Sequence, residues 1–524
     1  MTLLDFFRSI LRHLAAMLIF PSTLKHLGVS PKTSNAEVTV VKTTDDMASL
    51  DTLKEEVMRL FRYPCTMRRM LSMSSALRIQ YKAKLQESEA CMLPSYCHTM
   101  PTGQEKGTYI SLDVGGSTFR VALVELLGRD TRPHPMVIKR MTSSKIDERI
   151  RKLPSAQFFD WMAGRIQDML EQEETPLISN EPLPLGLAWS FPIEQTSRRG
   201  GRMQGMGKGF SCHQDTIGMD LGTLVEKACA GRQLNIRVEA IVNDSSATLL
   251  SQAYLDPATS MGLILGTGTN VAAYLPTSCM GKSKFGTRDP AWFEGAEKVI
   301  TNTELSMFGK SILPETRWDE LLNLQHQLPD FQPLEYMTTG RYLGELLRLI
   351  IVEAVEMGEL FHGVMPEPLL ERYSLDTEIL ARLEEDKSRN MTDSVSVSVI
   401  QQAFALKVPP TLREISFLRT AAESISYRAS AYIAVAVHAL WALQRDADIN
   451  PAASRGKSKT SIACNGSVIL KYPGFKDRCE GFLQRMSKTG SLTRVFASPK
   501  IVLQATDEAA ILGAAVAVAL ADVP

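Results

Sequence analysis

The chain contains 524 residues, of which 44% are hydrophobic, and its 58 basic and 58 acidic residues give a formal net charge of zero. This length and apolar fraction allow a large buried core in two to four domains, and the neutral charge provides no basic field that would attract nucleic acid. The eight cysteines are scattered without CxxC pairs or Cys/His clusters, which indicates reduced thiols in an intracellular protein rather than disulfides or a zinc site.

The first twenty residues, MTLLDFFRSILRHLAAMLIF, are strongly apolar but carry four polar residues that fall on one side of a helix. These are Asp5, Arg8, Arg12 and His13. The uncharged run after His13 is too short to span a bilayer, and the charges within the apolar part argue against a cleaved signal peptide. An amphipathic helix on a membrane surface fits this pattern, and so does a helix packed on the protein's own core. The polar stretch 21–46 predicts a linker.

Strand and helix patterns alternate along the rest of the chain, which indicates an α/β protein. Residues 50–61 have apolar residues at helical spacing, and 109–126 contains two apolar runs separated by Gly115-Gly116, which predicts two strands joined by a turn. The further elements expected are a strand at 183–193, a strand and a helix at 237–255, two strands at 261–276, helices at 342–360 and 415–443, a strand at 461–470 and a helix at 507–520. No period of 20–50 residues is present, which excludes a solenoid.

Two segments of the chain share one plan, an apolar strand, a turn rich in glycine and a second strand. They are YISLDVGGSTFRVALVEL and GLILGTGTNVAAYL, with Gly115 and Gly266 at matching positions of the turn. Taken alone, each turn is typical of an ordinary hairpin in which glycine supplies positive φ. Two related lobes would instead bring the turns face to face, where their backbone N–H groups can bind the phosphates of one nucleotide.

Two charged residues accompany the first turn and point to a ligand rather than to a simple hairpin. Asp113 ends the first strand, and Arg120 follows the turn. A carboxylate at this position is suited to Mg²⁺ or its water ligands, and a guanidinium is suited to phosphate. The sequence therefore predicts a nucleotide site formed by Asp113, Arg120 and the two turns.

The motifs resemble, in chain order, those of the eukaryotic hexokinases from about residue 50 onward. They read MLPSY…PTGQEKGTYISLDVGGSTFRV, LGLAWSFPIEQ…GKGF, VNDSSATL, LGTGTN, ELSMFG, EYMTTGRYLGELLRL and NGSVILKYPGF. The resemblance implies two actin-like (ribonuclease H-like) α/β lobes, with a cleft between them, that close on a hexose and Mg·ATP. It places the N-terminal lobe at 45–254 and the C-terminal lobe at 255–524, preceded by the apolar segment and linker at 1–44.

The resemblance also implies roles for individual residues. Asp244 would be the general base, and Lys208 and Arg120 would face the transferred phosphoryl group. The sugar-binding residues would be Ser190, Phe191, Lys208, Asn243, Asp244, Asn270, Glu304 and Glu335. The residues binding ATP would be Asp113, Gly115, Gly116, Ser117, Thr118, Thr267, Gly268, Gly466 and Ser467, with Asp113 also holding Mg²⁺. The structural alternatives are a helix cap for Asn243 or Asp244, a helix-start acid for Glu335 and a solvated loop lysine for Lys208.

Several positions depart from the family pattern, mostly on the nucleotide side. Thr118 stands where the family has Asn, Gly207 where it has Thr, and Asn465 where it has Asp. Ala509-Ala510-Ile511 replaces Gly-Ser-Gly, and a β-branched residue such as Ile511 resists unusual backbone angles.

Two functions are consistent with these motifs: an ATP-dependent hexokinase acting on glucose, fructose or mannose, and a regulatory hexose-binding protein with weakened catalysis. Asp244 and the two phosphate turns favour the first, whereas Asn465 and the run 509–511 favour the second. A nucleotide-operated chaperone is disfavoured by the intact sugar residues. The resemblance further implies a cytoplasmic protein, with residues 1–20 attaching to a membrane surface such as the mitochondrial outer membrane.

Overall fold

The computed structural model describes the chain from Ser49 onward, with gaps. The described residues are 49–131, 133–171, 181–206, 209–211, 215–386, 388, 395–447, 459–489 and 500–522. The predicted N-terminal helix and linker lie outside them, as do Gly207 and Lys208. None of the described helices is long and apolar enough to cross a membrane.

Two β-sheets with the same strand plan form the framework. The first contains, in spatial order, β4 (Met136–Lys145), β3 (Thr118–Leu126), β2 (Gly107–Val114), β5 (Leu183–Trp189) and β8 (Ile236–Val242). The second contains β1 (Leu93–Pro94), β11 (Lys298–Asn302), β10 (Thr269–Pro276), β9 (Thr259–Leu265), β12 (Lys459–Asn465) and β13 (Lys500–Ala505). In each sheet an antiparallel meander of three strands is followed by two parallel strands. This duplicated plan confirms the internal similarity that the two glycine turns predict.

The predicted turns are the corresponding hairpins of the two sheets. The Gly115 N–H donates to Thr118 O at 3.0 Å between β2 and β3, and the Gly266 N–H donates to Gly268 O at 2.9 Å between β9 and β10. The register of the first hairpin places Asp113 directly opposite Arg120. Both turns therefore lie at the same end of the central strand of their sheet.

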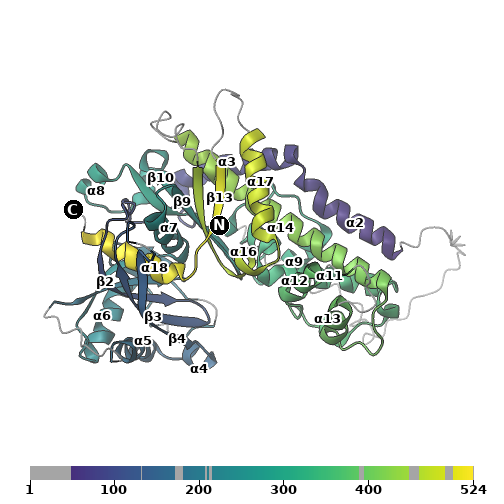
Figure 1. The fold of residues 1–524 in the computed structure, drawn as a ribbon, viewed down its shortest axis with the longest axis horizontal. Helices are drawn as coiled ribbons and strands as arrows, with labels where there is room; N and C mark the ends of the chain where they lie inside the picture. The colour runs from purple at the N-terminus through teal and green to yellow at the C-terminus, as the bar shows by residue number, and fades with distance from the viewer. Residues whose placement is uncertain are drawn as a thin grey trace, which may run out of the picture. The chain divides into compact units, whose positions relative to one another are not determined.

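Each of two helices packs on the sheet other than the one whose strands precede it in the chain. α7 (Asp244–Leu255) follows the first sheet but packs on β9 and β10, whereas α18 (Ala509–Ala519) ends the chain but packs on β2 and β5. The two helices also pack against each other, and Figure 1 shows α18 (yellow) lying across the strands of the first sheet. One core cluster accordingly contains residues from both sheets and both helices.

The small residues of α18 allow this close packing. A Cβ on Gly513 would lie 1.9 Å from Ala247 O of α7, and a Cβ on Gly186 of β5 would lie 2.3 Å from Ala514 O. Both distances are far below van der Waals contact, so larger side chains would force the helices and the sheet apart. The alanine-rich sequence at 507–520 thus reflects a helix that is buried on nearly all sides.

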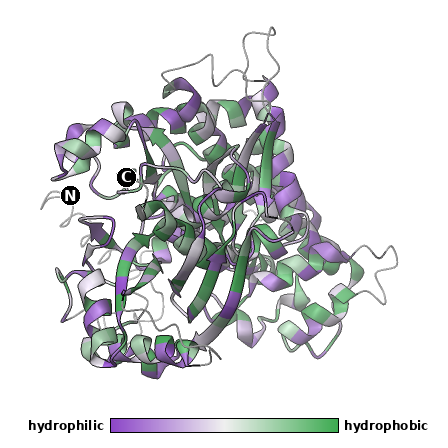
Figure 2. Cartoon of the chain, turned by 60° about the vertical axis from the view of Figure 1, so that its left-hand side comes forward, coloured by the Kyte–Doolittle hydropathy of each residue, from purple (hydrophilic) through white to green (hydrophobic). Residues whose placement is uncertain are grey.

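The other helices cover the outer faces of the sheets. The first sheet carries α5 (Ser155–Leu170), α6 (Leu221–Gly231) and the short α4 (Glu148–Arg151). The remaining helices belong to the half of the molecule built on the second sheet. They are α2 (Leu50–Arg62), α3 (Met67–Glu87), α8 (Pro290–Gly295), α9 (Arg317–Gln325), α10 (Pro333–Thr338), α11 (Gly340–Glu356), α12 (Thr377–Glu385), α13 (Val395–Ala403), α14 (Leu412–Ala447), α16 (Ser467–Lys471) and α17 (Phe475–Thr489). Figure 2 shows hydrophobic and hydrophilic residues alternating along these helices, as expected for one buried face.

The packing differs from the predicted lobe boundaries of 45–254 and 255–524. The sheets follow the boundary except for β1. However, α2 and α3 belong to the core built on the second sheet, α7 packs mainly on that sheet, and α18 packs on the first sheet. The reason is that a helix buries its apolar face wherever a matching apolar surface is available, irrespective of its order in the chain.

Candidate active site

Asp244 lies at the first position of α7, directly after β8. The N-cap is Asn243, whose Oδ1 accepts hydrogen bonds from Ser245 N at 2.9 Å and Ser245 Oγ at 2.7 Å. The capping role therefore belongs to Asn243. The carboxylate of Asp244 accepts from Ser245 N at 2.8 Å and lies at the positive end of the helix dipole.

A chain of polar side chains follows in the second sheet. Asn270 Nδ2 donates to Asn302 Oδ1 at 2.7 Å, and Asn302 Nδ2 donates to Glu304 Oε1 at 2.8 Å. Glu304 adopts the left-handed conformation with φ 50°, which costs about 1 kcal/mol or more for a residue with a side chain. Such a fixed row of amides and a carboxylate matches the alternating donors and acceptors of a polyhydroxyl ligand.

Glu304 also interacts electrostatically with Asp244. Burial raises the pKa of the Glu304 carboxyl, the hydrogen bond from Asn302 lowers it in part, and the negative charge of Asp244 raises it further. The two predicted sugar-site acids are therefore close enough to interact electrostatically, although they belong to different elements.

A pH dependence of sugar binding follows from the raised pKa of Glu304. In the predicted sugar site the ionised carboxylate would accept hydrogen bonds from sugar hydroxyls, so sugar affinity should fall as the pH decreases, beginning at a higher pH than for an ordinary glutamate. At full protonation we expect a loss of affinity of roughly 10- to 150-fold, since a hydrogen bond to a charged group contributes about 1.5–3 kcal/mol. Calorimetric glucose titrations between pH 5 and 8 measure this, and Glu304→Gln should flatten the profile. An unchanged profile in Glu304→Gln would assign the dependence to another group.

The second glycine turn packs against three other segments. Glu335 of α10 accepts from Thr269 N at 3.2 Å through Oε2, and the Gly340 N–H at the start of α11 donates to Gly266 O at 2.9 Å. A Cβ on Gly266 would lie 3.2 Å from Ser467 N, so Gly466 and Ser467 are immediate neighbours of the turn. The structure thus brings Glu335, which the sequence assigns to the sugar site, close to Gly268, Gly466 and Ser467, which it assigns to the nucleotide site.

The first turn is connected to α18 by Arg120. The guanidinium donates to Asp113 Oδ2 through Nε at 2.9 Å and Nη2 at 2.5 Å, and through Nη1 to Glu508 Oε2. Burial alone would lower the pKa of Arg120, but the two carboxylates outweigh it and raise the pKa above its usual value. Arg120 is therefore held by Asp113 and Glu508, a pairing with protein carboxylates that the sequence prediction of a phosphate contact did not include.

The other residues of the first turn use their carbonyl groups within the protein. Gly116 O accepts from Arg151 Nη2 at 3.0 Å, and Ser117 O accepts from Ile146 N at 2.8 Å. Ser117 is exposed, and Thr118 is half-buried as the first residue of β3. These bonds tie the turn to α4 and to the segment that follows β4.

Ser190 and Phe191 follow β5. The Ser190 N–H donates to Val114 O at 3.2 Å, which ties the ends of β5 and β2 together. The ring of Phe191 is buried against Trp189 and Phe210, with centroid distances of 5.2 and 5.1 Å. The prediction that Phe191 binds sugar therefore does not apply to its side chain, because an aromatic ring in this position is held in the core.

At two positions that depart from the family pattern, the structure shows what the side chain contacts. Asn465 donates through Nδ2 to Thr506 O at 2.5 Å, a hydrogen bond that an ionised aspartate cannot donate. Ile511 lies in regular α-helix and is completely buried in the layer between the sheets. The expected backbone strain at Ile511 is absent, and its side chain contributes to the core instead.

Two residues of the site were missed from the sequence. Asn302 links Asn270 to Glu304, and its only sequence signal is its place at the end of a strand two residues before Glu304. Glu508 pairs with Arg120 from the other end of the chain. Within the described residues no group of three or more His, Cys, Asp or Glu side chains is arranged as a metal site.

Comparisons with known proteins agree with this architecture. Two family models, both described as Hexokinase, match residues 55–254 and 260–520. The chain is 32% identical to Hexokinase-1 of Saccharomyces cerevisiae over 438 residues, which is 82% of this chain and 84% of that protein. It is 31% identical to Hexokinase-2 of Candida albicans over 440 residues, with the same two shares.

A solved structure extends the similarity to the fold. The hexokinase from Schistosoma mansoni complexed with glucose superposes with a TM-score of 0.73 at 26% identity, covering 90% of this chain and 100% of that one. The two sheets with exchanged helices are thus the two actin-like lobes of this structure class. From its family models, its relatives and its fold, this chain belongs to the hexokinase family.

Proposed function

We propose that this sugar kinase transfers the γ-phosphoryl group of ATP to the 6-hydroxyl of a hexose, with Asp244 as the general base. The observation that carries the proposal is the position of Asp244, which starts the helix shared by both sheets and interacts electrostatically with Glu304. Phosphoryl transfer needs mainly positioning and electrostatic stabilisation, so one base beside an oriented hydroxyl is sufficient.

The proposed reaction forms one bond to the γ-phosphorus and breaks another. Asn270, Glu304 and Glu335 orient the hexose through its ring hydroxyls, and Asp244 accepts the proton of the 6-hydroxyl. The hydroxyl oxygen forms a bond to the γ-phosphorus while the bond from that phosphorus to the β,γ-bridging oxygen breaks, which releases ADP. The backbone N–H groups of the two turns at Gly115–Thr118 and Gly266–Gly268 would face the phosphates.

Mg²⁺ fits this arrangement as an ion that accompanies the nucleotide. It is usually bound through one or two carboxylates together with phosphates and water. Asp113 near the end of β2, whose Oδ2 pairs with Arg120, would be the carboxylate that holds it. When bound, Mg²⁺ would neutralise part of the phosphate charge.

The test is a coupled assay of the purified protein with Mg·ATP and glucose, fructose or mannose, combined with calorimetry of each sugar. Turnover with at least one hexose supports the kinase. Hexose binding without turnover would instead support the regulatory hexose-binding protein, which the pairing of Arg120 with Glu508 favours. Absence of binding to all three sugars at millimolar concentration would refute both.

Glu508→Gln should tighten Mg·ATP binding. In the proposed site Glu508 competes with the phosphate for Arg120, and its negative charge repels the phosphate. The side chains of Arg120 and Glu508 are both about one-third exposed or less. Removing the charge of Glu508 should make the free energy of Mg·ATP binding more favourable by about 1 kcal/mol, which corresponds to a roughly fivefold lower KM for ATP. The matched control is Glu125→Gln, which breaks the Lys139 pair farther along the same strand and should leave the KM unchanged. A KM that stays at the wild-type value in Glu508→Gln would remove Glu508 from the nucleotide site.

We also propose that residues 1–20 attach the protein to a membrane surface, namely the mitochondrial outer membrane. The support is the amphipathic pattern of Asp5, Arg8, Arg12 and His13 against an apolar remainder. Cell fractionation should find the full-length protein on membranes and a variant lacking these residues in the soluble fraction. Equal distributions would favour the alternative that this segment packs on the protein.

A further inference from the structure

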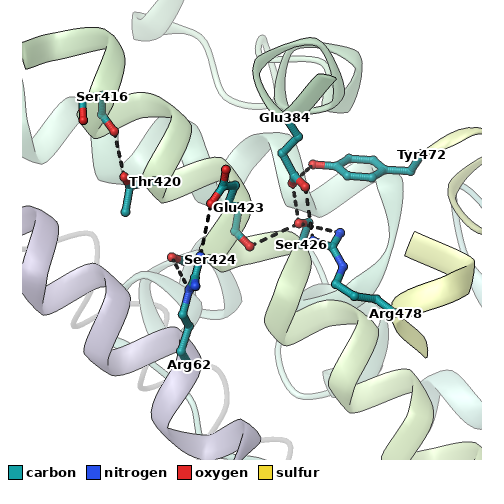
Figure 3. A network of polar contacts seen from close by, with 9 residues as sticks. All are labelled: Arg62, Glu384, Ser416, Thr420, Glu423, Ser424, Ser426, Tyr472 and Arg478. Atoms are coloured by element: carbon teal, nitrogen blue, oxygen red, sulfur yellow. Dashed lines mark hydrogen bonds and ion pairs between the residues drawn. The ribbon is translucent and has the colours of Figure 1, made fainter. Parts of the chain in front are cut away.

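A buried carboxylate on α12 takes no part in the proposed chemistry. Glu384 of α12 is 6% exposed, and its Oε1 accepts from Tyr472 OH at 2.6 Å and from Ser426 Oγ. Arg478 donates to Glu384 Oε2 at 3.3 Å and to Ser426 Oγ at 3.0 Å. Figure 3 shows these four side chains converging from four different segments of the chain.

Tyr472 connects this network to the nucleotide side. Its backbone N–H donates to Val468 O at 3.2 Å and closes α16, the short helix that begins at Ser467. Gly466, with φ 115°, precedes this helix and packs beside Gly266. A helix of five residues has little stability of its own, so the position of its last turn depends on how Tyr472 is held.

The other end of α12 holds the opposite side of the same turn. Thr377 Oγ1 donates to Gly340 O at 2.5 Å and accepts from Gly344 N at 3.1 Å, both in α11. Gly340 in turn donates its N–H to Gly266 O. The first and last turns of α12 therefore attach to the two segments, α11 and α16, that flank the turn Gly266–Gly268.

A purely structural role would not require this chemistry. Buried ionisable groups are often replaceable by apolar residues of similar size without loss of stability, and three aligned donors on one carboxylate fix geometry more narrowly than apolar packing does. Burial raises the pKa of Glu384, and Arg478 together with the hydrogen bonds from Ser426 and Tyr472 offsets part of this rise.

We propose that Glu384 is a positioning residue for the nucleotide, acting through Tyr472 to fix α16 and the Gly466–Ser467 backbone beside the phosphate turn. The proposal rests on the proposed ATP-dependent function. It predicts that loosening the network weakens nucleotide binding and leaves the sugar site, formed by other elements, unaffected.

Tyr472→Phe tests the proposal with little change in volume. We expect a roughly five- to tenfold higher KM and Kd for Mg·ATP, with the KM for the sugar within twofold. Hydrogen exchange in the protein without ligands should also become faster at amides 466–472. The matched control is Tyr432→Phe, which removes another buried O–H donor, to Pro314 O at 2.8 Å, and should change neither readout.

A conservative pair of variants at the carboxylate separates positioning from packing. Glu384→Gln keeps an oxygen that accepts from Tyr472 and Ser426 and should retain near-wild-type KM for ATP. Glu384→Leu has a similar volume without an acceptor and should reproduce the Tyr472→Phe effect. Unchanged exchange at 466–472 in Tyr472→Phe, or equal nucleotide affinities in all variants of a protein that binds Mg·ATP, would overturn the inference. A wild-type protein that binds no nucleotide would refute the proposed function and the role of Glu384 with it.

Discussion

Replacing Asp244 by asparagine is expected to lower kcat by roughly 10²–10⁴-fold, the usual contribution of a general base. The amide keeps the size of the side chain and an oxygen that can accept from Ser245 N, as the carboxylate does at 2.8 Å, but it cannot take a proton. Because Asn243 forms the N-cap, the helix should keep its start, and sugar affinity should stay within about tenfold. Steady-state kinetics and glucose calorimetry on the same preparation measure both quantities.

The control for this variant lies at the opposite end of the same helix. Asp256, the C-cap residue of α7, pairs with Lys459 at 2.7 Å, and Asp256→Asn makes the same chemical change away from the site. It should leave kcat unchanged. An Asp244→Asn protein that retains more than half of the wild-type kcat would exclude Asp244 as the base.

Ile511→Ala is expected to destabilise the protein by about 2–5 kcal/mol, because it deletes a large part of a fully buried side chain between two sheets. For a protein of this size that corresponds to a decrease in Tm of roughly 2–5 °C in differential scanning calorimetry. Leu512→Ala on the same helix is the control. Leu512 is only partly buried, so the loss should be clearly smaller.

The same packing argument applies to residues 509–511, which depart from the family pattern on the nucleotide side. Returning Ala509-Ala510-Ile511 to Gly-Ser-Gly would open a cavity at 511 and would place two glycines in α18, each costing about 1 kcal/mol. We therefore expect such a variant to lose stability rather than to gain nucleotide affinity. An Ile511→Ala protein as stable as the wild type would show that this layer can collapse around the missing atoms.

Local sequence patterns determined much of the framework. Alternating apolar residues around Gly115 and Gly266 correctly predicted the two matching hairpins, and the apolar run ending at Asn243-Asp244 predicted a strand followed by a helix. These features depend on interactions between residues a few positions apart, such as turn hydrogen bonds and the N-cap, which is why they can be recognised in the sequence. The order of motifs also identified the family.

The tertiary structure alone decided which surfaces and charges meet. Arg120 and Glu508 are separated by 388 positions, and Glu384 and Tyr472 by 88, so no local pattern relates them. The exchange of α7 and α18 between the sheets likewise depends on which apolar surfaces fit together at close range. Ile511 and Phe191 illustrate the consequence: their types suggested effects on ligands, and packing placed both side chains in the core. Charge pairing and close packing act through space, and only the folded chain brings those partners within reach.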